Sequence, residues 1–490
     1  MTELLGGLLA VITLESMSAM LMGTAAGILV GAIPGLTATL AMALLLPFTY
    51  AMDPFISLGM MAGIYNGSMF GGAIPAILMK IPGTPSAVAT VFDGNPLAAS
   101  GRAKFAIHVA LCSSSAGSVI SAIALMLLAP PLVELALKFG PVEYFWIAIF
   151  GMTSVSLLLA SAPAKGLASA LIGIAVGIVG MDMISGAERL VFDVRSVAGG
   201  INIAVLLTGL FAIPPALAML DAHSRKLGDV AISGQGITIK DALYLVKTWL
   251  RSGLIGVFVG VMPGAGGNLA GILSYAEEKR AAKDSSLFGK GDPRGVAASE
   301  CGNNADNASS LIPTLALGVP GNSVAALMMG AMLIQGLNPG PALFTQSGDV
   351  VYGFMWQMLI TAFLMLAIGF VGTGLFVRML KVPTGLLAPM ILVVCSIGTY
   401  TASNNIADVW IMLVVGVCAF LLSRSGYPIA PIVLGAILGP MAETSFRQSV
   451  LISRGDPLAF FASPISIVLV TLIAAVLLFP LWRWFRQSRA

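Results

Sequence analysis

Long hydrophobic runs separated by short polar links dominate the chain. Nine runs are each about 20 residues long, enough to cross a bilayer, and they predict helices at 105–129, 143–162, 166–186, 201–221, 350–377, 384–402, 405–423, 427–445 and 463–482. Two further regions, 20–97 and 253–336, are as apolar but are broken repeatedly by Gly and Pro. The pattern predicts an all-α polytopic membrane protein with broken helices and about 11 crossings plus two hairpins.

The two broken regions resemble each other. GILVGAIPGLTATLA (27–41) aligns with GVFVGVMPGAGGNLA (256–270), with identity at seven of 15 positions. Downstream, AIPAILMKIPGTPSA (73–87) aligns with LIPTLALGVPGNSVA (311–325), so that Pro-Gly pairs recur at matching places. Two linked blocks of identity indicate an internal duplication.

The distribution of Lys and Arg predicts how each copy lies in the membrane. Cytoplasmic links collect cations; ten of the 25 Lys and Arg lie between Arg225 and Arg294, and none precedes Lys80. The first copy follows a segment without cations and exits to Arg102, whereas the second follows a basic stretch and exits to a segment without cations. Opposite orientations of this kind define an inverted-topology repeat, which is common in secondary transporters.

The first Pro-Gly block of each copy is too short for two crossings, which need about 40 residues, although both of its flanks lie on one side by charge. We therefore expect re-entrant hairpins. The predicted organisation is a first repeat over 1–222 (hairpin 20–46, broken helix region 57–97, helices 105–221), a basic linker over 223–252, and a second repeat over 253–490 (hairpin 253–276, charged insert 277–295, broken helix region 296–336, helices 350–482). The linker and the C-terminus are predicted to be cytoplasmic because both are basic.

Composition excludes several classes of protein. Hydrophobic residues make up 58% of the chain and charged residues only 10%, whereas soluble proteins carry about 25% charged residues. Two His and no GxxxxGK[ST] motif argue against a His-rich metal centre and a nucleotide-driven pump. GKGD (289–292) imitates an intramembrane aspartyl protease signature but lacks a second catalytic Asp. We expect no enzyme activity, no cofactor, and no nucleic-acid partner.

The Pro-Gly breaks are candidate binding elements. A helix that stops there has free carbonyl groups, which suit a cation, and the next helix begins with free N–H groups, which suit an anion. Helix starts at Gly35, Gly83, Gly264 and Gly321 would neutralise an anion. The candidate substrate-binding residues are Pro34, Gly35, Thr37, Thr39, Asn66, Ser68, Pro82, Gly83, Thr84, Ser86, Gly264, Gly266, Asn268, Pro320, Gly321, Asn322 and Ser323.

CGNNADNASS (301–310) is a dense polar segment beside apolar runs. An ionisable residue at membrane depth indicates function, and hard oxygen ligands suit a small cation, so the predicted cation ligands are Asn303, Asn304, Asp306, Asn307 and Ser309. The alternative is an aqueous loop at the membrane surface, because Arg294 and Glu300 are near.

Two other features have two interpretations each. Gly23, Gly27, Gly31 and Gly35 form a stripe that favours close helix packing, although they also precede a Pro-Gly break. Lys80 stands directly before the first IPG. It either neutralises an anionic substrate or extends to the cytoplasmic interface.

The stretch from GAIPGLTATLA through YNGSMFGGAIPAILMKIPGTPSA, with GVMPGAGGN, CGNNADNASS and LGVPGNS, closely resembles the large membrane subunit of tripartite tricarboxylate transporters over essentially the whole chain. The resemblance implies a multi-pass permease of the bacterial inner membrane that works with a small membrane subunit and a periplasmic solute-binding protein. It implies import of a carboxylate such as citrate, driven by a sodium or proton gradient. A channel or exporter of the same architecture without a binding protein is the alternative.

Overall fold

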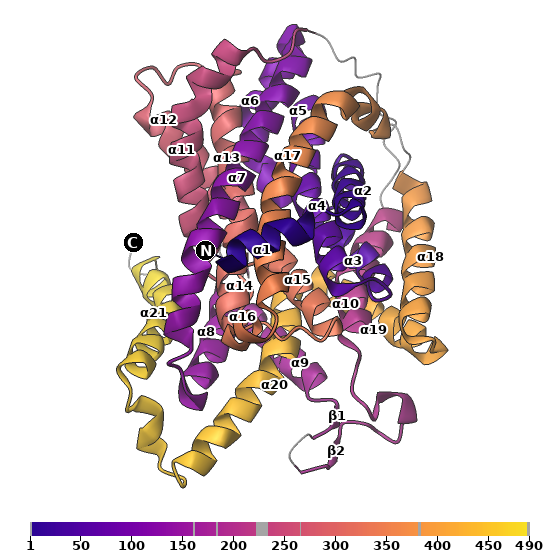
Figure 1. Cartoon of the computed structure of the whole chain (residues 1–490), viewed down its shortest axis with the longest axis vertical. Helices are drawn as coiled ribbons and strands as arrows, with labels where there is room; N and C mark the ends of the chain where they lie inside the picture. The colour runs from indigo at the N-terminus through magenta and orange to yellow at the C-terminus, as the bar shows by residue number, and fades with distance from the viewer. Residues whose placement is uncertain are drawn as a thin grey trace.

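The computed structural model describes residues 2–159, 162–182, 185–221, 234–264, 266–380 and 384–487. Helices dominate these residues; the strands they contain are β1 (Gly180–Met181) and β2 (Glu188–Arg189), which pair as one antiparallel hairpin. Eight helices in this part of the chain are long and apolar enough to cross a membrane. The prediction of an all-α polytopic membrane protein is confirmed (Figure 1).

The nine hydrophobic runs correspond to nine helices: α7 (Ala103–Ala136), α8 (Pro141–Leu159), α9 (Pro163–Gly177), α10 (Ile203–Asp221), α17 (Gly348–Met379), α18 (Thr384–Ser403), α19 (Ile406–Arg424), α20 (Ile429–Ile452) and α21 (Pro464–Gln487). α9 ends well before position 186, where the sequence predicts its end. The chain turns into the β1–β2 hairpin there, and Gly180 takes a positive φ of 115° that a helix cannot contain.

The two broken regions fold as similar series of elements: a helical hairpin, a long helix, a seven-residue helix and a further helix. The first contains α2 (Leu14–Gly31), α3 (Ala38–Thr49), α4 (Pro54–Gly71), α5 (Ala73–Met79), η1 (Pro85–Ala87), α6 (Val88–Leu97) and η2 (Ala98–Arg102). The second contains α11 (Ile239–Val261), α12 (Gly266–Ala281), α13 (Pro293–Ser309), α14 (Leu311–Leu317), α15 (Ser323–Ile334) and α16 (Pro341–Gln346). Helices stop at the aligned Pro-Gly pairs in both.

The same local signals act in both copies. α4 and α13 each start with an Asp N-cap followed by Pro, and Asp53 and Asp292 accept backbone hydrogen bonds at 2.9 Å. α5 and α14 are each seven residues long and end at a left-handed residue, Lys80 (φ 59°) or Gly318 (φ 70°). The duplication seen in the sequence therefore has a structural counterpart.

The first arm of each hairpin begins upstream of its predicted block, at Leu14 instead of residue 20 and at Ile239 instead of residue 253. α2 has 18 residues and α11 has 23, and both have the length of a membrane span. α11 begins at Ile239, inside the predicted 223–252 linker, because Thr238 and Asp241 form a capping box. The earlier part of that linker, through residue 233, and the last three residues of the predicted cytoplasmic C-terminus lie outside the described residues.

Glycines allow the first arm of each hairpin to pack against the backbone of the following long helix. A methyl group on Gly27 of α2 would lie 2.5 Å from the carbonyl oxygen of Ile64 on α4, and Gly256 of α11 faces the carbonyl of Gly302 on α13 in the same way. The tight-packing interpretation is confirmed for Gly23, Gly27 and Gly31; Gly35 lies in the turn after α2 with a φ of 88°, and a methyl group there would lie 3.6 Å from the Met219 side chain.

The charged insert between α12 and α13 is attached to the first copy. The buried Asp93 of α6 accepts hydrogen bonds at 2.8 Å from the N–H groups of Gly289, Gly291 and Asp292, and at 2.9 Å from the hydroxyl of Tyr275. The GKGD segment is therefore a backbone cradle for a carboxylate.

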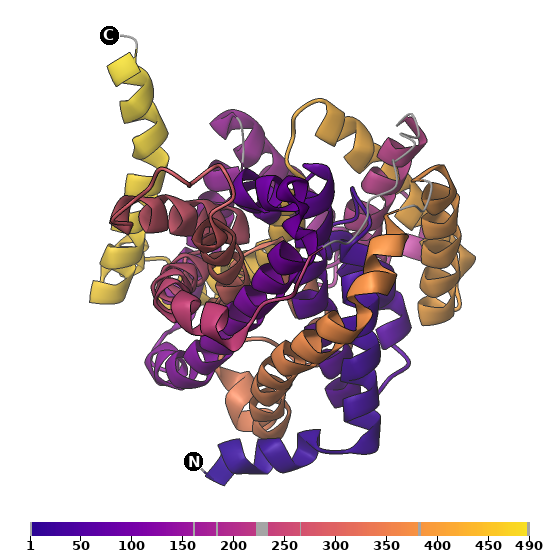
Figure 2. The same cartoon turned by 90° about the horizontal axis from the view of Figure 1, so that it is seen from above.

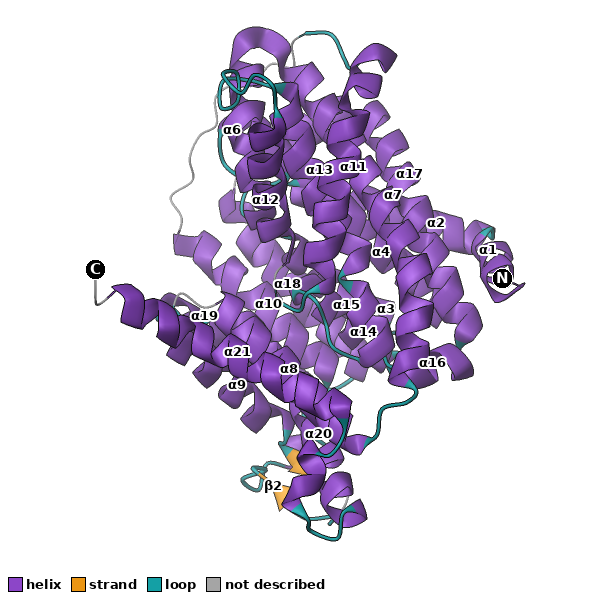
Figure 3. Cartoon of the chain, turned by 90° about the vertical axis from the view of Figure 1, so that its left-hand side faces the viewer, coloured by secondary structure: helices purple, strands orange, loops and turns teal. Residues whose placement is uncertain are grey.

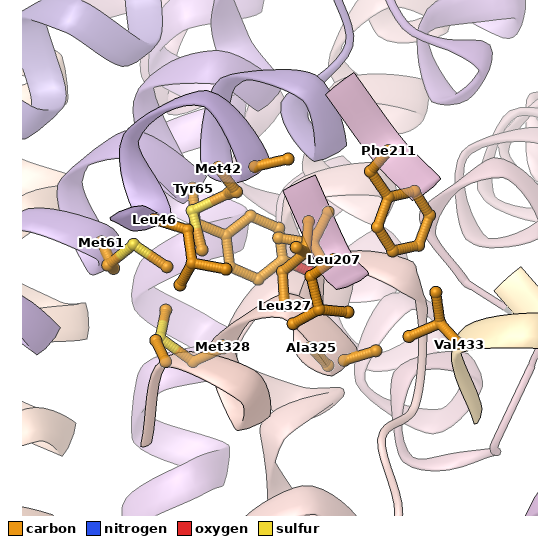
Figure 4. Close-up of a cluster of buried hydrophobic side chains, with 14 of the residues drawn as sticks. Met42, Leu46, Met61, Tyr65, Leu207, Phe211, Ala325, Leu327, Met328 and Val433 are labelled. Atoms are coloured by element: carbon orange, nitrogen blue, oxygen red, sulfur yellow. The ribbon is translucent and has the colours of Figure 1, made fainter. Parts of the chain in front are cut away.

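Both copies share one core. Buried side chains from α3, α4, α10, α15 and α20 interdigitate in it, including Met42, Leu46, Met61, Tyr65, Leu207, Phe211, Leu327, Met328 and Val433 (Figure 4). α1 (Thr2–Val11) runs across the bundle against α17, where Trp356 Nε1 donates to the Leu4 carbonyl at 2.7 Å. It lies on a different flank from α21 (Figure 2), and α21 runs obliquely beside α8 (Figure 3).

Candidate functional site

A cavity of about 170 Å³ lies where the helix breaks of the two copies meet. It is surrounded by the first residues of α3, α12 and α15, by the turn that precedes α6, and by side chains of α4 and α13. Its lining residues are Thr37, Ala38, Thr39, Tyr65, Met69, Thr84, Pro85, Ser86, Gly264, Gly266, Gly267, Asn268, Asp306, Asn322, Ser323 and Val324. The cavity therefore collects three helix N-termini.

N-cap side chains shape two of these helix starts. Thr37 Oγ1 accepts from the Leu40 N–H at 3.2 Å, and Asn322 Oδ1 accepts from the Ala325 N–H at 2.8 Å. Each cap satisfies one of the orphan donors of its helix, and the earlier N–H groups of the first turn stay available for a ligand. Such groups, with the positive end of the helix dipole, favour an anion.

The two Pro-Gly breaks of the second copy are tied together. Gly264 N donates to the carbonyl of Gly321 at 2.7 Å, and Gly264 takes a positive φ of 87°. In the first copy, Gly83 N donates to the carbonyl of Gly72 at 3.1 Å. The Pro-Gly pairs at 82–83 and 320–321 thus form the scaffold behind the cavity, and the residues after them line it.

Asp306 is the carboxylate of this cavity, and it is fully buried. Its Oδ2 accepts from Asn322 Nδ2 at 2.7 Å, and the same amide donates to the hydroxyl of Tyr65 at 2.9 Å. Its Oδ1 accepts no well-formed hydrogen bond among the described residues, although the backbone N–H of Gly267 lies toward this carboxylate. An ionised oxygen in this position needs a partner, and a bound cation would supply one.

The predicted cation cluster separates onto two faces of α13. Asp306 faces the cavity and Asn303 faces Gly267 and Gly271 of α12, and both polar atoms of the Asn303 side chain lack partners among the described residues. Asn304 and Asn307 face α4 and α7: Asn307 Nδ2 donates to Asn66 Oδ1 at 2.9 Å. At about 100° per residue, the four positions follow one another around the helix in the order 306, 303, 307, 304, so Asp306 and Asn304 lie at opposite edges of an arc of about 160°.

The surface-loop alternative for residues 301–310 is wrong. Residues 301–309 are helical, and all ten positions are buried. A loop at the membrane surface would leave these side chains in water. Instead, α13 is packed between α4, α7, α11 and α12, which cover its side chains.

Sequence comparisons agree with this architecture. The family model described as "Tripartite tricarboxylate transporter TctA family" matches residues 17–434. The chain belongs to this family. An "Uncharacterized 52.8 kDa protein in TAR-I ttuC' 3'region" of Agrobacterium vitis is 36% identical over 469 residues, covering 95% of this chain and 93% of the relative. An uncharacterized protein in the TAR-II ttuC' 3'region of the same organism is 38% identical over 234 residues, covering 48% of this chain and 97% of that protein. No solved structure matches the chain.

In this TctA-family chain, the cavity brings together ten of the residues predicted from sequence: Thr37, Thr39, Thr84, Ser86, Gly264, Gly266, Asn268, Asp306, Asn322 and Ser323. The other predicted residues lie outside its lining: Pro34, Gly35, Asn66, Ser68, Pro82, Gly83, Asn303, Asn304, Asn307, Ser309, Pro320 and Gly321. The sequence missed Tyr65 and Met69, which come from α4 in the first copy. The segment YNGSMFGG drew attention to its Asn and Ser, and nothing local indicates that its aromatic residue faces the site.

Lys80 does not line the central cavity of this TctA-family chain. It caps α5 in the exposed left-handed position and borders a separate hollow with Phe92, Asn95 and Lys279. This location fits the interpretation in which its amine extends to the membrane interface.

Proposed function

We propose that this chain is the large permease subunit of a tripartite, binding-protein-dependent importer of tricarboxylates or related carboxylates, driven by a sodium or proton gradient. Its partners would be a small membrane subunit and a periplasmic solute-binding protein, and it would work in the bacterial inner membrane. One observation carries the proposal: a cavity between the two copies combines three helix N-termini with a buried carboxylate that has a free oxygen.

The helix starts would bind the anionic substrate. The N–H groups of Ala38 and Thr39 begin α3, those of Ser323 and Val324 begin α15, and Gly267 belongs to the first turn of α12. The hydroxyls of Thr84 and Ser86, 3.0 Å apart, offer further donors beside them. Because these donors come from different elements, they can hydrogen-bond several carboxylate oxygens of one substrate at the same time.

Asp306 alone would repel a carboxylate. A small cation bound to its free Oδ1 would remove that repulsion and would bind better when substrate is present. Among the described residues, no three His, Cys, Asp or Glu side chains form a metal-binding group. One carboxylate among neutral oxygens is compatible with a monovalent cation such as Na⁺. Shared charge would therefore couple cation and substrate binding.

Alternating access would be possible because both copies contribute residues to the cavity wall. Tyr65 and Thr84 come from the first copy, and Asp306 and Asn322 from the second. Movement of one set of helices against the other would open the cavity toward one side at a time. The Tyr65–Asn322 hydrogen bond is one contact between the copies that this movement must break.

Uptake of radiolabelled citrate into proteoliposomes tests the proposal. The vesicles contain this chain with its small subunit, and the binding protein is supplied outside, with and without an inward sodium gradient. We expect accumulation that needs both the gradient and the binding protein. If sodium has no effect, uptake is measured in the same vesicles with an inward proton gradient and with other carboxylates. Equal flux under every gradient, without need of a binding protein, would favour the channel alternative.

A further inference from the structure

Glu300 is a second buried carboxylate, one and a half turns before Asp306 on α13. It is fully buried, and it contacts no Lys, Arg or His within the described ranges. Its Oε2 accepts from Ser114 Oγ of α7 at 3.0 Å, and its Oε1 is hydrogen-bonded to Thr90 Oγ1 of α6. A buried charge surrounded only by neutral groups is costly unless something neutralises it.

The two carboxylates call for different neutralising partners. Asp306 lines a cavity and has an oxygen without a hydrogen-bond partner, which leaves a place for a cation. Both oxygens of Glu300 are already hydrogen-bonded directly to protein side chains. What Glu300 lacks is compensation of its charge, and a proton on its own carboxyl group provides this without needing space.

A count of hydrogens supports the protonated form. Ser299 Oγ donates to the Val296 carbonyl at 3.2 Å and also lies 2.8 Å from Thr90 Oγ1, which contacts Glu300. These three hydrogen bonds require three hydrogens, and the two hydroxyl groups carry two. The carboxyl group of Glu300 supplies the third if it donates to Thr90, Thr90 donates to Ser299, and Ser299 donates to the carbonyl.

Other titratable groups on the helices around α13 have partners of their own. Asp93 on α6 binds Tyr275 of α12 and the insert backbone, Glu278 on α12 pairs with Arg251 of α11 at 2.9 Å, and Tyr65 on α4 binds Asn322. Arg280 pairs with Glu277 at 2.8 Å and Arg294 with Asp292 at 2.6 Å. His108 on α7 packs on the Phe370 ring, and the Cys301 thiol donates to the Trp249 carbonyl. The remaining groups on these helices are half-buried or exposed: Lys104, Cys112, Glu134, Lys240, Asp241, Tyr244, Lys247 and Lys279. In the described structure none of them is bonded to Glu300.

We propose that Glu300 is a proton-carrying site of this transporter, separate from the cation site at Asp306. Glu300 belongs to α13 of the second copy, and its contacts across the copies are Thr90 on α6 and Ser114 on α7 of the first; within α13, Asn304 Nδ2 lies 3.5 Å from its Oε2. Relative movement of the copies would separate the carboxyl group from Thr90 and Ser114 and expose it to water. The proton would enter from water on one side of the membrane and leave to water on the other. This proposal rests on the proposed transport function.

Glu300→Gln tests the proposal because the amide keeps the shape and hydrogen bonding of the acid but cannot release a proton. In proteoliposomes with the small subunit and the binding protein, we expect E300Q to retain exchange of labelled for unlabelled citrate. A gradient of one pH unit supports up to about tenfold accumulation per coupled proton, and E300Q should lose this accumulation. The proposal is wrong if E300Q accumulates citrate with the proton gradient as the unsubstituted protein does. It is also wrong if the unsubstituted protein does not respond to that gradient. Neither result would contradict the proposed transport function.

Infrared spectroscopy gives a second readout that needs no transport. We expect a carboxylic-acid C=O band that is absent in E300Q and shifted in Thr90→Val, which removes the hydroxyl partner. Glu278→Gln is the matched control, since Glu278 is also buried, at 5% exposure, but is paired with Arg251, and it should leave the band unchanged. If the unsubstituted protein exchanges no carboxylate, the proposed function is wrong. The infrared band would still show whether the carboxyl group of Glu300 is protonated. An unchanged band in E300Q overturns the proposal.

Discussion

The two copies share a backbone plan but differ in charge at the position of Asp306. Register carried upstream from the aligned segments at 73–87 and 311–325 places Ser68 of α4 where Asp306 stands on α13. Ser68 Oγ donates to the Tyr65 carbonyl within its own helix, whereas Asp306 reaches Asn322 and the cavity. Both copies contribute helix starts to the cavity, but among the described residues only the second contributes a carboxylate. Under the proposed function, both copies would bind the anion and the second copy would couple the cation.

The glycine packing common to both copies should give the largest effect on stability. Gly27→Ala places a methyl group 2.5 Å from a backbone oxygen of α4, and Gly256→Ala meets the α13 backbone in the same way. Each substitution should lower the free energy of unfolding by about 3 kcal/mol, measured by thermal unfolding in detergent. Gly374→Ala on α17, where the new methyl group meets nothing within 4 Å, is the control. Equal melting temperatures for all three variants would contradict the packing argument.

The charge difference between the copies is tested by Asp306→Asn. Loss of the carboxylate removes the partner of the cation, and we expect at least about tenfold lower cation-driven accumulation, equivalent to about 1.4 kcal/mol. Ser68→Ala, at the aligned position of the first copy, should change cation dependence little. Uptake measured over a range of sodium concentrations distinguishes the effects of the two substitutions. A D306N protein with unaltered sodium dependence would remove the cation site from the proposal.

Asn322 and Thr84 occupy aligned positions after the Pro-Gly breaks, and their contacts differ. Asn322 caps α15 and also binds Asp306 and Tyr65, whereas Thr84 contacts the Ser86 hydroxyl. Asn322→Ala should cost about 1 kcal/mol through the cap alone and raise the substrate KM about fivefold. Thr84→Ala should have a smaller effect in the same uptake assay. The reverse order would mean that the first copy dominates substrate binding.

The smallest expected change in stability comes from the left-handed residue that ends α5 in the first copy and α14 in the second. Lys80 takes the left-handed conformation that Gly318 takes in the second copy, and this conformation is strained for any residue with a side chain. Lys80→Gly should raise the free energy of unfolding by about 1 kcal/mol, and Gly318→Lys should lower it. Thermal unfolding measures both. Citrate uptake by K80G should stay normal, because Lys80 lies outside the cavity.

Much of the fold could be predicted from sequence. Apolar runs locate the nine helices because a buried or lipid-facing helix needs continuous hydrophobic side chains. Pro-Gly pairs locate the breaks because Pro lacks a donor and Gly permits positive φ. The start of α11 at Ile239 was also readable from Thr238 and Asp241, but the basic residues around it favoured a linker.

The candidate site was predictable only in part. Thr37, Asn268 and Asn322 follow helix breaks, so local sequence was enough to select them. The separation of Asp306 from Asn304, and the approach of Tyr65 and Thr90 to α13, depend on contacts between residues more than 200 positions apart. Sequence therefore determined where helices run, break and repeat, since these properties are local. Tertiary structure alone decided which polar side chains share the cavity and which stay buried beside Glu300, because packing between the two copies selects the face of each helix.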